Sequence, residues 1–289
     1  MIDQREVIWG VIAPPVLMAI GMVATAYLPV TRRFLSTGAL LALVFGVCQL
    51  GFNGWPMPGS NVHDWPAWIA FAGGAITFCS ACASGPLVWR VIIRLAITGV
   101  ASWLLMALEL RGSSASTSAV WIISTTLLWT ALILAWERAQ AATTPGISVT
   151  VLTTLAGLTS VSLLLFNTMD HAQFAGILTA ALDAAAVLSW WRPTWYAPTG
   201  PVIIAALVLP SLWLLGTFAV YTGLPKWSLP LLALAGLAPL LTAITPARNW
   251  SAWKRLLLAN LVTVVLVSPV LIWGVITSIK ASSEPSYGY

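Results

Sequence analysis

Charged side chains are scarce in this sequence: Asp, Glu, Lys and Arg make up 7% of 289 residues, and only eight residues are acidic. Soluble domains carry about 25% charged residues, so the composition excludes a soluble fold of this length. Catalytic signatures are also missing, since the chain has no H-E-x-x-H, G-x-S-x-G or Walker A sequence. An enzyme is therefore not the favoured class.

Cysteine is almost absent as well. Cys48, Cys79 and Cys82 all lie in apolar runs, which excludes a disulfide framework. Cys79 and Cys82 form a C-x-x-C, but a zinc site takes about four ligands and the chain has no second pair. We interpret these cysteines as small residues that allow close helix packing, and we expect neither a metal nor a cofactor.

Long apolar runs are what the sequence does contain. Apolar residues make up 59% of the chain, and the mean hydropathy is +0.92. A transmembrane helix needs about 20 apolar residues. Ten segments qualify as predicted spans: 8–30, 37–53, 66–84, 88–110, 118–136, 148–167, 173–191, 201–222, 228–246 and 256–279.

These runs predict an all-α, polytopic helical bundle of about ten spans in one membrane domain, residues 1–281. A polar tail that we expect to be disordered follows at 282–289. The lipid bilayer is the expected partner, other membrane subunits are a further option, and nucleic acid is not expected.

The distribution of Lys and Arg predicts the orientation in a cell membrane. With the N-terminus outside, nine basic residues fall on the inner connections and four on the outer ones. Cytoplasmic loops are enriched in basic residues, so both termini are predicted on the non-cytoplasmic side. The connections after spans two and six, which hold no Lys or Arg, are then outer loops.

Those two loops hold the only histidines, and each histidine is next to an acid: His63 with Asp64, and His171 with Asp170. Because both loops are predicted on one face, they could converge into a site. Two histidines with a carboxylate form a credible metal-binding set. The alternative is a pair of polar loop tips without a ligand.

Two dipeptides recur at nearly one offset. Phe-Asn occurs at 52–53 and 166–167, and Gly-Pro at 85–86 and 200–201, which are offsets of 114 and 115 residues. This pattern indicates a possible parallel repeat of spans one to four in spans five to eight, with two added spans.

Asp183 lies near the middle of span seven among small residues. An acid at that depth costs about 2.5–3.5 kcal/mol on insertion scales, so we expect it to face the bundle interior. Arg90 and Arg94, one turn apart on span four, are its candidate partners. The alternatives are an arginine that only reaches the headgroups and a neutral or paired acid with a structural role.

Three function classes follow from these observations. The first is a small-solute or proton-coupled transporter with Asp183 as its intramembrane polar site. The second is a non-catalytic subunit of a membrane complex. The third is an enzyme or cofactor-handling protein that uses the outer His–Asp loops.

Overall fold

The computed structural model describes residues 4–27, 30–55, 62–78, 87–106, 110, 114–195, 199–218, 223–243 and 245–283. These residues are almost entirely helical and contain no strand, which confirms the predicted all-α bundle. The α-helices are α1 (Gln4–Val7), α2 (Ala13–Ala26), α3 (Val30–Phe52), α4 (Trp65–Phe78), α6 (Leu87–Met106), α7 (Ala115–Ala141), α8 (Pro145–Leu165), α9 (Met169–Trp191), α10 (Thr199–Thr217), α11 (Ser228–Ala235), α12 (Thr245–Arg248) and α13 (Ala252–Ser283). A π-helical turn, η1 (Ile8–Ile12), joins α1 to α2, and three 3₁₀ turns complete the path: η2 (Val62–Asp64), η3 (Pro193–Trp195) and η4 (Ala238–Ala243).

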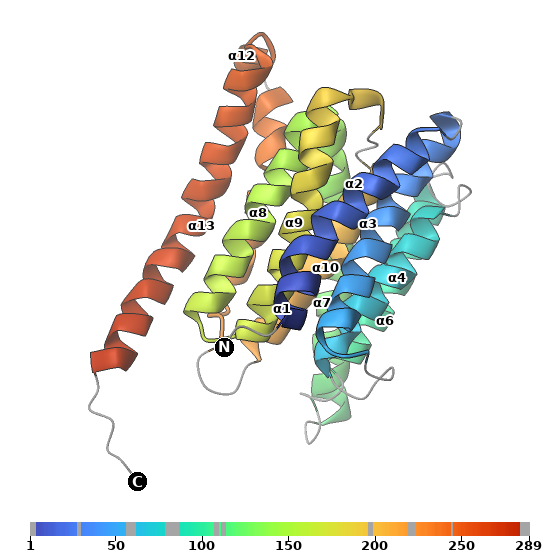
Figure 1. Cartoon of the computed structure of the whole chain (residues 1–289). Helices are drawn as coiled ribbons and strands as arrows, with labels where there is room; N and C mark the ends of the chain where they lie inside the picture. Colours follow the sequence, from blue (N-terminus) through green and yellow to red (C-terminus); the bar gives the residue numbers. More distant parts are fainter. Residues whose placement is uncertain are drawn as a thin grey trace.

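The helices run side by side between two ends (Figure 1). We call the end where η2 lies and α8 passes into α9 the histidine end, because it holds His63 and His171. We call the opposite end, where α6 and α13 begin, the arginine end, because it holds Arg90 and Arg255. Helix α1 begins and α13 ends at the histidine end (Figure 1). The first and last described helices therefore have their free ends at the same end of the bundle, and the membrane side of that end stays a prediction.

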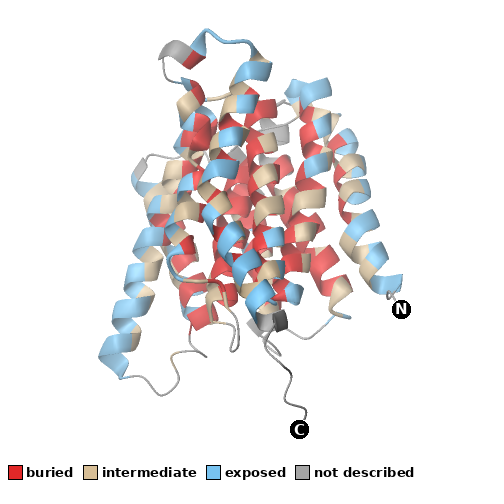
Figure 2. Cartoon of the chain, turned by 90° about the vertical axis from the view of Figure 1, so that its left-hand side faces the viewer, coloured by how far each residue is buried: buried red, intermediate tan, exposed pale blue. Residues whose placement is uncertain are grey.

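The outer surface of the bundle is apolar. Buried residues lie inside and exposed residues face outward (Figure 2), and among the exposed ones are Ile20 at 62%, Leu128 at 73% and Leu261 at 62%. Among the described residues, seven helical segments are long and apolar enough to cross a membrane, while α4, the apolar part of α3 (Thr37–Phe52) and the segment of α11 with η4 (Ser228–Ala243) are shorter. The chain is therefore a multi-span membrane protein, and the count of ten spans stays a prediction.

Helix α10 forms the centre of the bundle. It packs against α3, α4, α7 and α9, and 89% of its residues from Gly200 to Thr217 are buried. The helix approaches α3 closely, since a Cβ on Gly38 would lie 2.6 Å from Cα of Gly200. Pro210 interrupts α10 and has no N–H for the carbonyl of Ala206. The indole Nε1 of Trp129 on α7 donates to that carbonyl at 2.6 Å, so the free acceptor is satisfied from a neighbouring helix.

In two later helices, a side chain likewise donates to a backbone carbonyl near the point where the helix ends or is interrupted. Helix α11 ends at Ala235, and Trp136 of α7 donates its Nε1 to the Ala233 carbonyl at 2.9 Å. Pro269 interrupts α13, and the hydroxyl of Ser268 donates to the Val265 carbonyl that the proline leaves free. Irregular backbone at membrane depth persists only where such partners exist.

The parallel repeat receives no support from the packing. Helices α3 and α4 pack on each other as α8 and α9 do, but α2 packs against α9 whereas α7 packs mainly against α6 and α10. Phe52 and Phe166 also differ, since the first ends a helix and the second caps one. The predicted tail boundary at 282 falls inside α13, and residues 284–289 lie outside the described residues.

Candidate functional site

The two histidines meet at the histidine end. Nδ1 of His63 lies 2.9 Å from Nε2 of His171, and the ring centroids are 4.8 Å apart. This contact brings the two histidine loops together at one end of the bundle. It joins η2, before α4, to the first turn of α9.

The end of α3 positions His63. Gly54 adopts a left-handed backbone with φ +76°, which turns the chain so that N–H of Trp55 donates to the carbonyl of Leu50 at 2.7 Å. Asn53 donates its side-chain amide to Oδ1 of Asp64 at 2.8 Å. This bond and a bond from Gln49 hold η2 over the end of α3.

Gln49 completes that anchor from within α3. Its Nε2 donates to the backbone carbonyl of His63 at 2.8 Å, and its Oε1 is buried without a partner among the described residues. Asp64 is 2% exposed. Asp64 therefore helps to hold the loop against α3 and is not a solvent-exposed loop tip.

A short turn positions His171. Asn167 adopts φ +56°, and both the N–H and the hydroxyl of Thr168 donate to the carbonyl of Leu163, at 3.0 and 2.7 Å. Helix α9 can therefore begin at Met169 and carry His171 in its first turn. Asp170 is exposed.

The histidine contact lies among aromatic rings. His171 is only 4% exposed and packs edge-on against Phe174, which in turn meets Phe52 at a centroid distance of 6.2 Å. Nδ1 of His171 is buried and has no partner among the described residues. A buried polar atom without a partner is uncommon in proteins, so this nitrogen is available to a proton, a water molecule or a polar ligand.

The protonation of the pair is constrained by its geometry. The N···N contact requires one ring nitrogen to carry hydrogen and the other to offer its lone pair. Two imidazolium rings cannot make this contact, because neither of the facing nitrogens would then accept. The pair therefore holds at most one extra proton in this arrangement. The described residues include no group of three metal-ligating side chains.

A second polar site lies toward the arginine end. Arg94 on α6 donates through Nε and Nη2 to Oε1 of Glu137 on α7, at 3.2 and 2.7 Å, and the two side chains are 3% and 13% exposed. Nη1 of Arg94 is buried without a partner in the described part of the chain. The prediction that Arg94 pairs with Asp183 is thus wrong, because Glu137 occupies that role.

Asp183 is on the outside of the bundle. It is exposed on α9, whereas its neighbours Leu182 and Ala185 are buried. No described residue forms an ion pair with it. The expectation that it faces the interior is therefore wrong. Small residues surround Asp183 on every side, so the sequence held no signal for which face of the helix is buried. Arg90 is partly exposed, and its Nε lacks a partner among the described residues.

One face of α7 supplies residues that the sequence interpretation missed. Trp129, Ile133, Trp136 and Gln140 are all buried and share one helical face. Gln140 is 1% exposed, and neither its amide nitrogen nor its oxygen has a partner in the described residues. Glu137 was missed because the predicted span ended at 136, whereas α7 continues to Ala141. The cysteines Cys79 and Cys82 lie outside the described residues.

The fold and the apolar outer surface define a multi-span helical membrane protein. No family model, curated protein or solved structure matches this chain.

Proposed function

We propose that the protein is a proton-coupled transporter of a small polar solute, in which the His63–His171 pair binds the coupling proton. The observation that carries this proposal is the 2.9 Å contact between two titratable rings that belong to different helix pairs. The bundle's coarse class, a multi-span membrane protein, is common to all three predicted functions. The histidine contact favours the first.

Proton binding at this pair would move helices. A second proton places two positive charges in contact, and unit charges about 4 Å apart repel by about 4 kcal/mol at an effective dielectric constant of about 20. His63 is carried by the unit of α3 and α4, and His171 by the unit of α8 and α9; each unit is held by extensive internal packing. Repulsion at the histidines therefore separates two units, which is the kind of rearrangement that alternating access requires.

The ion pair supplies a place for the solute. Arg94 has an unpartnered Nη1, and Gln140, one turn along α7 from Glu137, has two unpartnered amide atoms. Buried polar groups of this kind require water or a polar ligand. Interrupted helices, such as α10 and α11 here, are typical of substrate sites in transporters. These features support a polar solute that accepts hydrogen bonds from Arg94.

One observation favours a second candidate, a non-catalytic subunit of a membrane complex. Asp183 is exposed on a face of α9 that borders lipid in the isolated chain, and an unpaired acid in hydrocarbon is costly. A basic side chain of another subunit would remove that cost. This candidate predicts no solute flux for the purified chain.

The decisive experiment measures solute-driven currents in proteoliposomes on a solid support. Mixtures of amino acids, carboxylates, sugars and nucleosides are applied with and without a proton gradient. We expect a current for at least one mixture that reverses with the gradient and is lost in His171→Gln. Asp170→Asn is the matched control, because it alters the adjacent, exposed residue. A current that ignores the proton gradient, or survives His171→Gln, would contradict the proposal.

Water access to the inner polar site separates the two candidates independently of the solute. In a chain without native cysteines, Gln140→Cys should react with a charged thiol reagent added at the arginine end. Ser211→Cys is the control, since Ser211 is fully buried in α10 and bonds to its own helix. Equal resistance of both positions would favour the close-packed subunit.

A further inference from the structure

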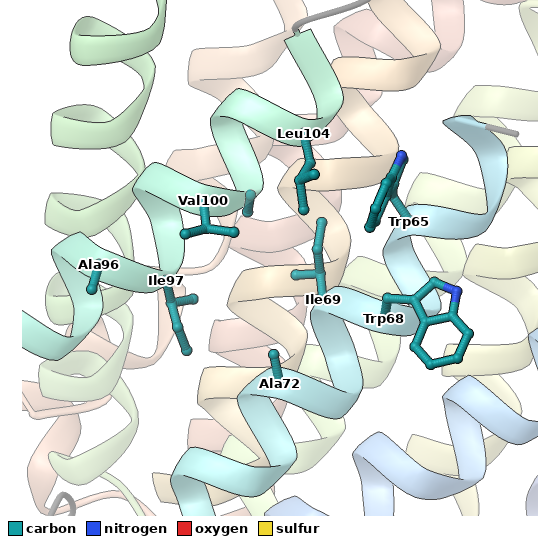
Figure 3. Close-up of a pocket in the computed structure, with 9 residues that line it drawn as sticks. Trp65, Trp68, Ile69, Ala72, Ala96, Ile97, Val100 and Leu104 are labelled. Atoms are coloured by element: carbon teal, nitrogen blue, oxygen red, sulfur yellow. The ribbon is translucent and has the colours of Figure 1, made fainter. Parts of the chain in front are cut away.

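A groove of about 390 Å³ lies between α4 and α6. Helix α4 contributes Trp65, Trp68 and Ile69 to its lining, and α6 contributes Ile97, Val100 and Leu104. Ile69 and Ile97 lie in the space between the two helices, whereas the ring of Trp68 lies on the side of α4 away from α6 (Figure 3). The lining side chains are aliphatic or indole, so the groove offers almost no polar contact.

The groove is open on one side. Ile69 and Ala101 are 5% and 2% exposed and form its floor, whereas Val100 is 58% exposed and Ala72 and Ala96 are exposed as well. The open side belongs to the face of α6 that includes Trp103 and Ile92, both about half exposed. Since residues 88–106 form a candidate span, this side faces hydrocarbon.

One end of the groove lies at the membrane interface, and the other lies deeper in the hydrocarbon region. Trp65 is the first residue of α4 and lies at the histidine end, and its indole nitrogen points away from Ala72 (Figure 3). Tryptophan prefers the membrane interface, where its ring is apolar and its N–H is hydrated or bound to a lipid oxygen. The groove therefore starts at the interface beside Trp65 and runs inward along Ile69 and Val100 to Ala72 and Ala96.

We propose that this groove binds one acyl chain of a phospholipid from the leaflet at the histidine end, with the glycerol ester region beside the indole N–H of Trp65. The volume lies in the range of about 300–1,000 Å³ that is typical of small-molecule sites. A partner helix is about 10 Å wide with its side chains, which is too wide for a groove of this volume between two neighbouring helices. The site is independent of the proton-binding pair and does not rest on transport.

The test uses photolabelling in a defined bilayer. The protein is reconstituted in vesicles of phosphatidylethanolamine and phosphatidylglycerol that contain a trace of phosphatidylcholine with a diazirine in one acyl chain. After illumination, lipid adducts are mapped by peptide mass spectrometry. We expect adducts to concentrate on peptides that contain 65–72 and 96–104, at least fivefold above other exposed spans.

Filling the groove should remove that signal. In Val100→Trp, the adducts at these peptides should fall at least fivefold, whereas Leu128→Trp, an exposed position on α7 that does not line the groove, should keep them. Ala96→Leu gives the same test if Val100→Trp lowers the yield of folded protein. Thermal unfolding in detergent checks that each variant is folded.

Three results would overturn the proposal. Adducts spread evenly over the exposed spans, or unchanged by Val100→Trp, would indicate ordinary surrounding lipid. Stronger labelling by a diazirine free fatty acid at the same mole fraction would assign the groove to that ligand. A protein–protein cross-link from position 96 or 100 would assign it to another helix.

Discussion

Nδ1 of His63 and Nε2 of His171 lie 2.9 Å apart although 108 residues separate them in the chain. The contact links the pair of α3 and α4 to the pair of α8 and α9 through two titratable rings.

The stability of the protein should fall when both rings are protonated. Histidine titrates near pH 6.5, and the contact resists a second proton whereas the separated rings of the unfolded chain do not. The unfolded state then binds more protons, so stability decreases as the pH falls from about 7.5 to 5.5. We expect the unfolding temperature to drop by several degrees over this range. His171→Gln should flatten the pH profile, because it removes the ring that is 4% exposed, and Asp170→Asn should leave it unchanged; a steep profile in His171→Gln would place the pH sensor elsewhere.

Breaking the inner ion pair should be costly. Glu137→Leu strands the guanidinium of Arg94, which is 2% exposed, and removal of one partner of a buried pair costs about 3–5 kcal/mol. The double variant Arg94→Leu with Glu137→Leu should recover a large part of that loss. Reversible unfolding in mixed micelles measures both values. Additive losses would show that the pair is not energetically coupled.

Trp129 and Pro210 should also be coupled. Trp129→Phe removes the donor to the Ala206 carbonyl, and an unsatisfied buried acceptor costs about 1–3 kcal/mol. In a Pro210→Ala background, residue 210 gains an N–H that can donate to this carbonyl within α10. Trp129→Phe should therefore cost less in that background. An equal cost in both would mean that the indole stabilises α10 by packing alone.

Asp183→Leu should not destabilise the isolated chain. The side chain is exposed and has no described partner, so a change in the free energy of unfolding within about 0.5 kcal/mol is expected, with an equal or higher yield of inserted protein. A large loss of stability in the purified chain would mean that the acid has a partner within it. A loss of stability that is seen in cells but not in the purified chain would favour a partner subunit.

Labelling tests the predicted sidedness. Trp55 and Asp170 are exposed at the histidine end, so cysteines at both positions should react with an impermeant reagent in intact cells. A cysteine at Trp253, exposed at the start of α13, should react only after permeabilisation. The reverse pattern would place the histidine end in the cytoplasm.

The helical class could be predicted because hydropathy reports on spans, and the distribution of basic residues led to the expectation that the two histidine loops share one side; it did not specify that the two rings touch. The polar residues that pair with each other within the membrane could not be predicted. Asp183 and Glu137 are both acids near small or aromatic residues, and only the rotation of α9 and α7 about their axes decides which one faces inward. That rotation depends on neighbouring helices, and the alanine-rich sequence around Asp183 carries no apolar stripe that specifies it.

Helix α10 also bears on how the protein is made. Its main neighbours α3, α4, α7, α8 and α9 all precede it in the chain, so each has been synthesised before α10 leaves the ribosome. During biogenesis α10 can pass from the insertion machinery into a partly assembled ring of helices, and its proline-interrupted backbone meets the indole of Trp129 on arrival. The order of synthesis thus spares the least regular helix of the core a long exposure to lipid.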